Sequence, residues 1–180
     1  MHAHTNVAQL VSGTIAVLAL AFCAERPAGA TPASGVTFTV LSRATVPEFD
    51  ASRRFREVSE KTGPQRDRVW KIELEATRMI DVVTVLFTVE PGGHGGWHTH
   101  PGPALFTVSA GTLTMYEGDD PACTPQLFPA GTGSVEAGTS DHIHILRNET
   151  GVVAQTIVTF LVPAGAQLRT DLPDPGNCPF

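Results

Sequence analysis

Short apolar stretches, each followed by turn-forming residues, recur along the chain from about residue 36 onward. The stretches are rich in β-branched residues and cover residues 36–41, 69–76, 79–89, 104–108, 113–116, 143–146 and 152–162. Glycine, proline, aspartate and asparagine gather between them, at 91–93, 101–103, 110–111, 118–121 and 148–151. Short strands with regularly spaced turns are typical of a sandwich or small barrel. We therefore predict an all-β domain.

The stretch at 81–89 (D-V-V-T-V-L-F-T-V) is apolar at positions of both parities. Alternate residues of a strand point to opposite faces of the sheet, so this pattern indicates burial on both faces. A partner subunit is one way to cover the outer face. We therefore expect a homodimer.

The segment before the second apolar stretch is rich in basic residues. Eight of the twelve lysine and arginine residues lie between Arg43 and Lys71, against five acidic residues there. Within this segment, residues 49–61 place Phe49, Phe55 and Val58 among charges, a pattern that allows a short helix. Two interpretations remain: a solvated arm, irregular or helical, or a lid that helps to hold an acidic substrate.

The N-terminal part has the composition of an export signal. Residues 7–24 are mostly small and apolar, and residues 28–30 (A-G-A) match a signal-peptide cleavage site. The run also approaches the roughly twenty residues that span a membrane, so a membrane anchor is the alternative. The sequence L-A-F-C at 20–23 resembles a lipoprotein box, but the bulky Phe22 argues against lipidation.

These patterns divide the chain into four parts. We expect residues 1–30 to be a signal peptide, 31–70 an N-terminal arm and first strand, 71–170 a β-barrel and 171–180 a C-terminal tail. The mature protein would be secreted, periplasmic or part of the cell envelope, with no stable membrane insertion after cleavage.

Cleavage after Ala30 leaves two cysteines, Cys123 and Cys178. An even number of cysteines in an exported protein indicates a disulfide. The bond would attach the C-terminal tail to the loop around Cys123. The alternative is a pair of free thiols that do not meet.

Charge and motif content exclude several classes of function. The net charge of −6 argues against a nucleic-acid-binding protein. The glycine-rich residues 92–96 lack the lysine and following helix of a phosphate-binding loop, and the chain has no C-x-x-C or H-E-x-x-H sequence.

The histidines carry the strongest chemical pattern. All five that follow the expected cleavage site lie in two groups, G-G-H-G-G-W-H-T-H at 92–100 and D-H-I-H at 141–144. Imidazole is the commonest transition-metal ligand among side chains. Residues i and i+2 of a strand share a face, so each H-x-H pair offers two nitrogens to one side of a sheet. Two such pairs predict a shared metal site.

Residues 92–148 resemble the two motifs of the cupin superfamily. The first motif, G(x)5HxH(x)3–4E(x)6G, is matched by Gly92, His98, His100 and Gly111, but its glutamate position holds Ala104. The end of the second motif, G(x)5PxG(x)2H(x)3N, is matched at 144 and 148, and its beginning fits loosely at 136–138 (E-A-G). The resemblance implies a small single-domain cupin-2-type protein with a double-stranded β-helix, or jelly-roll barrel.

The same resemblance implies a set of metal ligands. His98, His100 and His144 would bind one divalent transition metal, and nitrogen ligation alone cannot choose among Fe, Mn, Ni, Zn and Cu. Ala104 in place of the glutamate vacates a coordination position for water, substrate or a fourth histidine. Some three-histidine cupin dioxygenases that act on thiols or diketones also lack this glutamate.

The other two histidines have open roles. His142 shares strand parity with His144, so it is our candidate catalytic residue, as a general acid or base. It could also be a fourth ligand, a donor to a ligand, or a residue of the barrel mouth without metal contact. We expect His94, in its glycine-rich loop, to lie at the rim.

Several neighbours of the motifs have predicted positions. Glu136 has suitable parity but is expected in a turn, and Asp141 should face away, so either could replace the missing carboxylate only through a backbone bulge. Trp97 should face opposite to His98, into the core or an interface. Phe106 and Val108 share the parity of the histidines, so we expect them to line the floor of a small-molecule pocket.

We therefore expect an exported metal-binding protein that takes a small-molecule ligand or substrate. The leading hypothesis is a metal-dependent oxidoreductase of the dioxygenase type. The alternative is a non-catalytic metal- or small-ligand-binding protein of the cell envelope. An open fourth ligand position favours the enzyme, and a closed one favours the binding protein.

Overall fold

The computed structural model describes residues 29–51, 53–57, 68–138 and 142–180 of the 180-residue chain. Its strands, in chain order, are β1 (Ser34–Val46), β2 (Phe49–Asp50), β3 (Arg53–Glu57), β4 (Arg68–Ile72), β5 (Glu75–Ala76), β6 (Ile80–His94), β7 (His98–Thr99), β8 (Ala104–Ala110), β9 (Thr112–Glu117), β10 (Gln126–Pro129), β11 (Gly133–Glu136), β12 (His144–Arg147), β13 (Ala154–Pro163) and β14 (Thr170–Asp171).

The described residues contain no helix, so the predicted all-β class is confirmed. No helix in these ranges is therefore long and apolar enough to cross a membrane. The apolar run of the expected signal peptide lies in residues 1–28, outside the described part of the chain.

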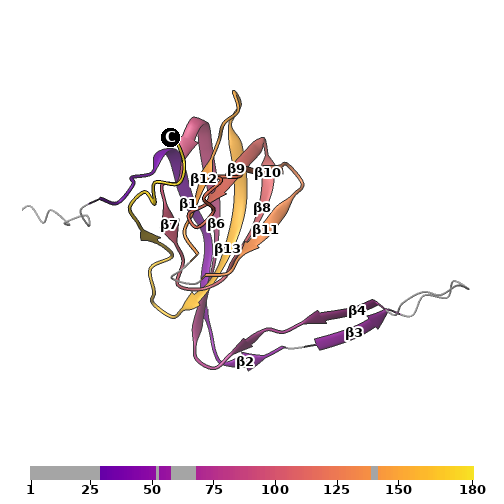
Figure 1. Ribbon diagram of the computed structural model, residues 1–180. Coiled ribbons are helices and arrows are strands. Elements are labelled where there is room, and N and C mark those ends of the chain that lie inside the picture. The colour runs from indigo at the N-terminus through magenta and orange to yellow at the C-terminus, as the bar shows by residue number, and fades with distance from the viewer. Residues whose placement is uncertain (1–28, 52, 58–67, 139–141) are drawn as a thin grey trace, which may run out of the picture.

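Ten strands form one curved sheet that makes the body of the molecule (Figure 1). Seven follow each other in the order β10-β9-β12-β6-β13-β8-β11, β1 pairs with β6, and β7 links β12 to β14. The long strand β6 is central, because it pairs antiparallel with β1 along one edge and with β13 along the other. The sheet curls into a nearly closed barrel with the core inside it.

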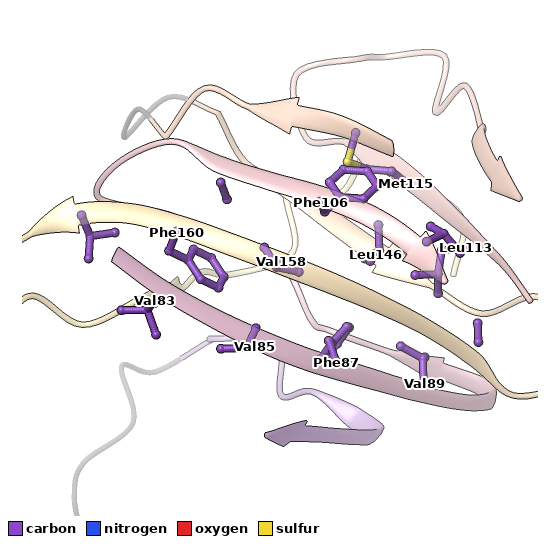
Figure 2. Packing of buried hydrophobic residues seen from close by; sticks show 14 residues of the cluster. Val83, Val85, Phe87, Val89, Phe106, Leu113, Met115, Leu146, Val158 and Phe160 are labelled. Carbon is purple, nitrogen blue, oxygen red and sulfur yellow. The ribbon is translucent and has the colours of Figure 1, made fainter. Parts of the chain in front are cut away.

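The main core follows from the alternation of buried and less buried residues along β6, β8 and β13. In β6, Val83, Val85, Phe87 and Val89 are buried. They meet inward side chains of β8, β9, β12 and β13, and Figure 2 shows both sets pointing into the same space. The residues of β6 between them are half-buried on the outer face. Within one chain, therefore, only one face of β6 is fully buried. The homodimer that we expected to cover the outer face stays a prediction.

The arm differs from the sequence-based expectation of a possible helix. Its described residues form two short antiparallel pairings, β2 with β5 and β3 with β4. Figure 1 shows this hairpin extending away from the barrel. The helical alternative for residues 49–61 is therefore wrong for 49–50 and 53–57, while 52 and 58–61 lie outside the described residues.

A second, smaller core lies beneath the C-terminal tail. Trp97, Tyr116, Ile145 and Cys178 are buried together in it. The predicted disulfide is confirmed, because Cys123 and Cys178 are bonded with a Cα–Cα distance of 5.2 Å. Trp97 faces this cluster and not the histidines, as its parity predicted.

Candidate metal centre

Three histidines from two paired strands converge inside the barrel. β7 presents His98, His100 is the residue directly after β7, and His144 begins β12 directly opposite His98. The ring centroid of His98 lies 4.4 Å from that of His144 and 4.8 Å from that of His100. One ligating nitrogen from each ring lies within 4.8 Å of the other two, so the group could hold a metal ion.

Backbone carbonyls fix the orientation of two of the rings. Nδ1 of His98 lies 2.7 Å from the Gly96 carbonyl oxygen, and Nδ1 of His100 lies 2.7 Å from the Leu168 carbonyl oxygen. A carbonyl only accepts, so Nδ1 carries the proton and the Nε2 lone pair of a neutral ring is free to bind a metal. Nδ1 of His144 is buried and has no hydrogen-bond partner among the described residues.

Burial keeps His98 and His144 in the neutral form. Burial lowers the pKa of His98 well below its ordinary value, and the positive charges of His144, Arg169 and His100 lower it further. Burial is also the main reason why the pKa of His144 is lowered to about 4. Neutral imidazole is the form that binds metals, so both rings are ready to ligate at neutral pH.

A carboxylate contacts two of the three rings. Oε2 of Glu136 lies 3.1 Å from Nε2 of His100, and Oε1 lies 3.4 Å from Nε2 of His144. Burial alone would raise the pKa of Glu136, but the hydrogen bond with His100 and the charges of His144, His100 and His142 outweigh it and lower that pKa. Glu136 is therefore anionic at neutral pH.

The donor set fits a divalent transition metal. It consists of imidazole nitrogens and one carboxylate oxygen, which are common ligands of Zn, Fe, Mn, Ni and Cu. The site therefore fits the metal that the cupin resemblance implies.

Glu136 corrects two expectations from the sequence. It is the last residue of strand β11 and not part of a turn, and the β11–β8 register runs to it without a bulge. The ligand position expected to be vacant at Ala104 is therefore approached by a carboxylate from another strand. Asp141, the other carboxylate considered, lies outside the described residues.

The histidines lie in a pocket whose walls are mostly apolar. Its lining comprises Phe38, Phe87, Phe106, Leu146, Val158, Phe160 and Leu168 together with the three histidines, Glu136 and Arg169. The expected position of Phe106 is thus confirmed, whereas Val108 belongs to the main core and does not line the pocket. Arg169 donates to the carbonyl oxygen of Gly95 (2.8 Å) and pairs with Asp171.

His142 and His94 lie outside the three-histidine group. Nδ1 of His142 lies 3.4 Å from Oε2 of Glu117, and its ring centroid is 5.1 Å from that of His144. Burial raises the pKa of Glu117, although the charge of His142 opposes that shift. His94 ends β6, and its Nδ1 accepts a hydrogen bond from the Gly96 amide (3.2 Å). The catalytic role of His142 stays a prediction.

Sequence reasoning did not identify Glu117 or Arg169 as site residues. Glu117 ends β9, opposite His144 in the β9–β12 pairing. Its place at the site therefore follows from the strand register, which the sequence does not show. Arg169 directly precedes β14, and no motif marks it.

No family model and no curated protein matches the sequence. Similar solved structures include an oxalate oxidase in complex with the substrate analogue glycolate (22% identity, TM-score 0.39, 44% of this chain and 41% of that chain). Others are a protein with a double-stranded β-helix domain from Klebsiella pneumoniae (20%, 0.41, 48% and 70%) and a cupin superfamily protein from Desulfitobacterium hafniense (15%, 0.39, 45% and 67%). The chain spans less than half the length of the oxalate oxidase that it matches.

These likenesses are distant, and what the neighbours bind is a property of those proteins. The strand order of this chain, its two motifs and its three converging histidines agree with one another independently of them. Together they give this chain a double-stranded β-helix fold, in agreement with the resemblance of its two motifs to the cupin superfamily.

Proposed function

We propose that this chain holds one divalent transition metal through His98, His100 and His144 and binds a small molecule in the adjoining pocket. The observation that carries the proposal is the convergence of three buried imidazoles, with ligating nitrogens within 4.8 Å of one another. Two of these rings are already oriented by backbone carbonyls, so little order has to be imposed when a metal binds.

The leading function for such a site is that of a metal-dependent oxidoreductase of the dioxygenase type. Phenylalanine, leucine and valine side chains wall the pocket, so a small and mainly apolar substrate would be kept from water next to the metal. A redox-active divalent metal, when bound, would supply the activation of O₂. Arg169 offers a cation for an acidic group on the substrate, and His142 offers a general acid or base beside the site.

Glu136 favours an alternative, a non-catalytic protein that binds a metal or a small ligand. A fourth protein ligand closes a tetrahedral site of the zinc type, which is typical of structural binding. The same four ligands leave two positions open on a six-coordinate metal such as Fe or Mn. Metal identity therefore decides between the two functions.

We also propose an exported location, either secreted or in the periplasm or cell envelope. The Cys123–Cys178 disulfide supports it, because such bonds persist in oxidising compartments.

Metal analysis of untagged protein tests the metal site. We expect about one metal ion per chain in the wild type and almost none in the His98→Ala/His144→Ala variant, since a site that loses two of three imidazoles cannot hold the ion. Equal, substoichiometric metal in both proteins would overturn the proposal.

Oxygen consumption then separates the two functions. The iron-loaded protein is mixed with a panel of thiols, diketones and small carboxylic acids while dissolved oxygen is recorded. Uptake that disappears in the double variant supports the dioxygenase. Tightly bound zinc with no oxygen uptake on the panel supports the non-catalytic binding protein.

A further inference from the structure

Glu136 and Ala104 occupy facing positions on neighbouring strands. In the antiparallel pairing of β11 with β8, Glu136 lies directly opposite Ala104, and the register continues to Gly133 opposite Thr107. Both residues are buried, with exposed fractions of 5% and 0%. Partners directly opposite in such a pair share one face of the sheet, with Cβ atoms about 5 Å apart. A side chain from position 136 therefore enters the space that a longer side chain at 104 would fill.

A close backbone contact holds this pairing at the site. Gly138 has φ +67°, and a Cβ added there would lie 2.0 Å from the carbonyl carbon and oxygen of Gly102. Only glycine allows the chain leaving β11 to approach the chain entering β8 this closely. The contact lies two residues beyond each partner, so it fixes Glu136 against Ala104.

The distances around Glu136 are those of ligands sharing one ion. Two atoms that are each about 2.0–2.2 Å from one metal lie about 2.8–3.6 Å apart at octahedral or tetrahedral angles. The carboxylate oxygens lie 3.1 Å from Nε2 of His100 and 3.4 Å from Nε2 of His144. Nδ1 of His100 donates to the Leu168 carbonyl oxygen, so Nε2 is the ring nitrogen that faces the carboxylate. Two such acceptors approach this closely only with a cation at Nε2, either a proton or a metal.

We propose that Glu136 is the carboxylate ligand of the metal, supplied by β11 in place of the side chain that is missing at Ala104 on β8. This inference rests on the proposed metal site and adds its fourth ligand. The carboxylate is thus on β11, the strand that pairs with β8, and lies outside the first motif. The ion would be bound by three nitrogens and one oxygen.

Cobalt binding to metal-free full-length protein tests the inference. Co²⁺ is titrated calorimetrically, and its visible absorption reports the ligand set. We expect Glu136→Ala and the nearly isosteric Glu136→Gln to weaken Co²⁺ binding by about 100-fold or more and to change the spectrum, because loss of a direct ligand exceeds the loss of an outer contact. Glu90→Ala is the control: it removes an exposed carboxylate of β6 that is not part of the site, and its affinity should remain close to that of the wild type.

The swap variant Ala104→Glu/Glu136→Ala tests the equivalence of the two positions. It should bind Co²⁺ about tenfold more tightly than Glu136→Ala, or better, since it returns a carboxylate to the same face. Thermal unfolding without metal verifies that each variant folds. The metal-induced rise in Tm should be large in the wild type and swap variant and small in Glu136→Ala.

The outcomes separate this inference from the proposed function. A wild type that binds no Co²⁺ overturns the metal site itself. A wild type that binds one Co²⁺, with unchanged affinity and spectrum in both Glu136 variants, overturns the role of Glu136 and leaves the three-histidine site standing. In that case Glu136 contacts His100 without binding the ion. A swap variant as weak as Glu136→Ala overturns the equivalence of positions 104 and 136.

Discussion

Asp81 anchors the start of β6 through a dense set of hydrogen bonds. It accepts bonds from Nε and Nη2 of Arg43 (3.1 and 2.7 Å), from the hydroxyl of Thr45 (2.7 Å) and from the amide of Gly165 (3.1 Å). These hydrogen bonds lower the pKa of Asp81 from 3.8 to about 2. The bond from Thr45 has the largest effect, followed by those from Arg43 and Gly165. The charged carboxylate is therefore the form that the folded state prefers.

This preference predicts how stability depends on pH. The contribution of Asp81 is complete above pH 4 and is lost as the pH falls from about 4 through about 2, because protonation removes it in that window. Asp81→Asn should be less stable than the wild type at pH 7, and the difference should shrink toward pH 2. Urea unfolding at pH 7, 4 and 2.5 measures it, with Asp174→Asn as an exposed control. A difference that is constant across this range would contradict the prediction.

His142 offers a second prediction about a single side chain. Its Nδ1 contacts Glu117, and it lies outside the three-histidine group. We expect His142→Ala to keep about one metal ion per chain, whereas His144→Ala loses it. If the protein is an enzyme with His142 as general acid or base, the variant should lose about 10²–10⁴-fold in kcat. Loss of the metal from His142→Ala would support its role as a fourth ligand instead.

The contrast between the histidines and Glu136 shows what the sequence can reveal at this scale. The H-x-H spacing places His98 and His100 on one side of a strand, so the sequence predicts their convergence directly. Glu136 is different, because its place depends on which residue of β8 it faces. A slip of one residue in that register would turn its side chain to the opposite face. Only the three-dimensional pairing shows that the carboxylate of Glu136 lies beside His100 and His144.

At the scale of elements, the pairing of β8 with β11 depends on glycines at its ends. Gly138 follows β11 and touches Gly102, which lies before β8. Gly131, before β11, also has positive φ (+87°), but a Cβ there would meet nothing within 4 Å. The two glycines thus share a backbone conformation and differ in crowding.

This difference allows a matched pair of substitutions. Gly131→Ala should cost about 1 kcal/mol, because an L-residue is placed in a left-handed conformation. Gly138→Ala should cost clearly more, about 3 kcal/mol or above, since its Cβ also collides with the Gly102 carbonyl. Gly138→Ala should also weaken Co²⁺ binding by displacing Glu136. Equal free energies of unfolding in the two variants would show that the contact is unimportant.

The arm shows where sequence reasoning failed at this scale. Residues 53–57 (R-R-F-R-E) lack the alternation of a half-buried strand, and we considered a helix there. In the structure they pair with residues 68–72 as a two-stranded hairpin outside the barrel. Alternation arises when one face of a strand is buried in a core. A hairpin that extends away from the barrel buries little of either face in a core. Its sequence therefore lacks the alternation by which a strand is identified.

For the whole molecule, the C-terminal tail is held across one end of the barrel. Asn177 donates to the carbonyl oxygens of Glu117 (2.8 Å) and Asp120 (2.7 Å). Phe180 stacks on Trp97, and the guanidinium of Arg147 lies 3.8 Å from the centre of the Phe180 ring. The tail thereby covers the second core next to the segment that carries His98 and His100. The Cys123–Cys178 disulfide attaches the tail covalently to the loop around Cys123.

The bond between Cys123 and Cys178 closes a sequence separation of 55 residues. In the chain-entropy description, a loop of this length corresponds to about 4 kcal/mol of stabilisation, because the unfolded chain loses freedom. Cys123→Ala/Cys178→Ala should therefore be less stable than the wild type by about 2–5 kcal/mol in urea unfolding. Reducing agent should destabilise the wild type by a similar amount and leave the variant unchanged.

The wild type must first show no titratable thiol at these two positions under non-reducing conditions, and two free thiols would rule the bond out. The tail contacts predict a further effect. Once the bond is gone, the stack of Phe180 on Trp97 has no covalent anchor, so tryptophan fluorescence should change before global unfolding. A double variant with a single coincident transition and wild-type stability would show that noncovalent contacts alone hold the tail.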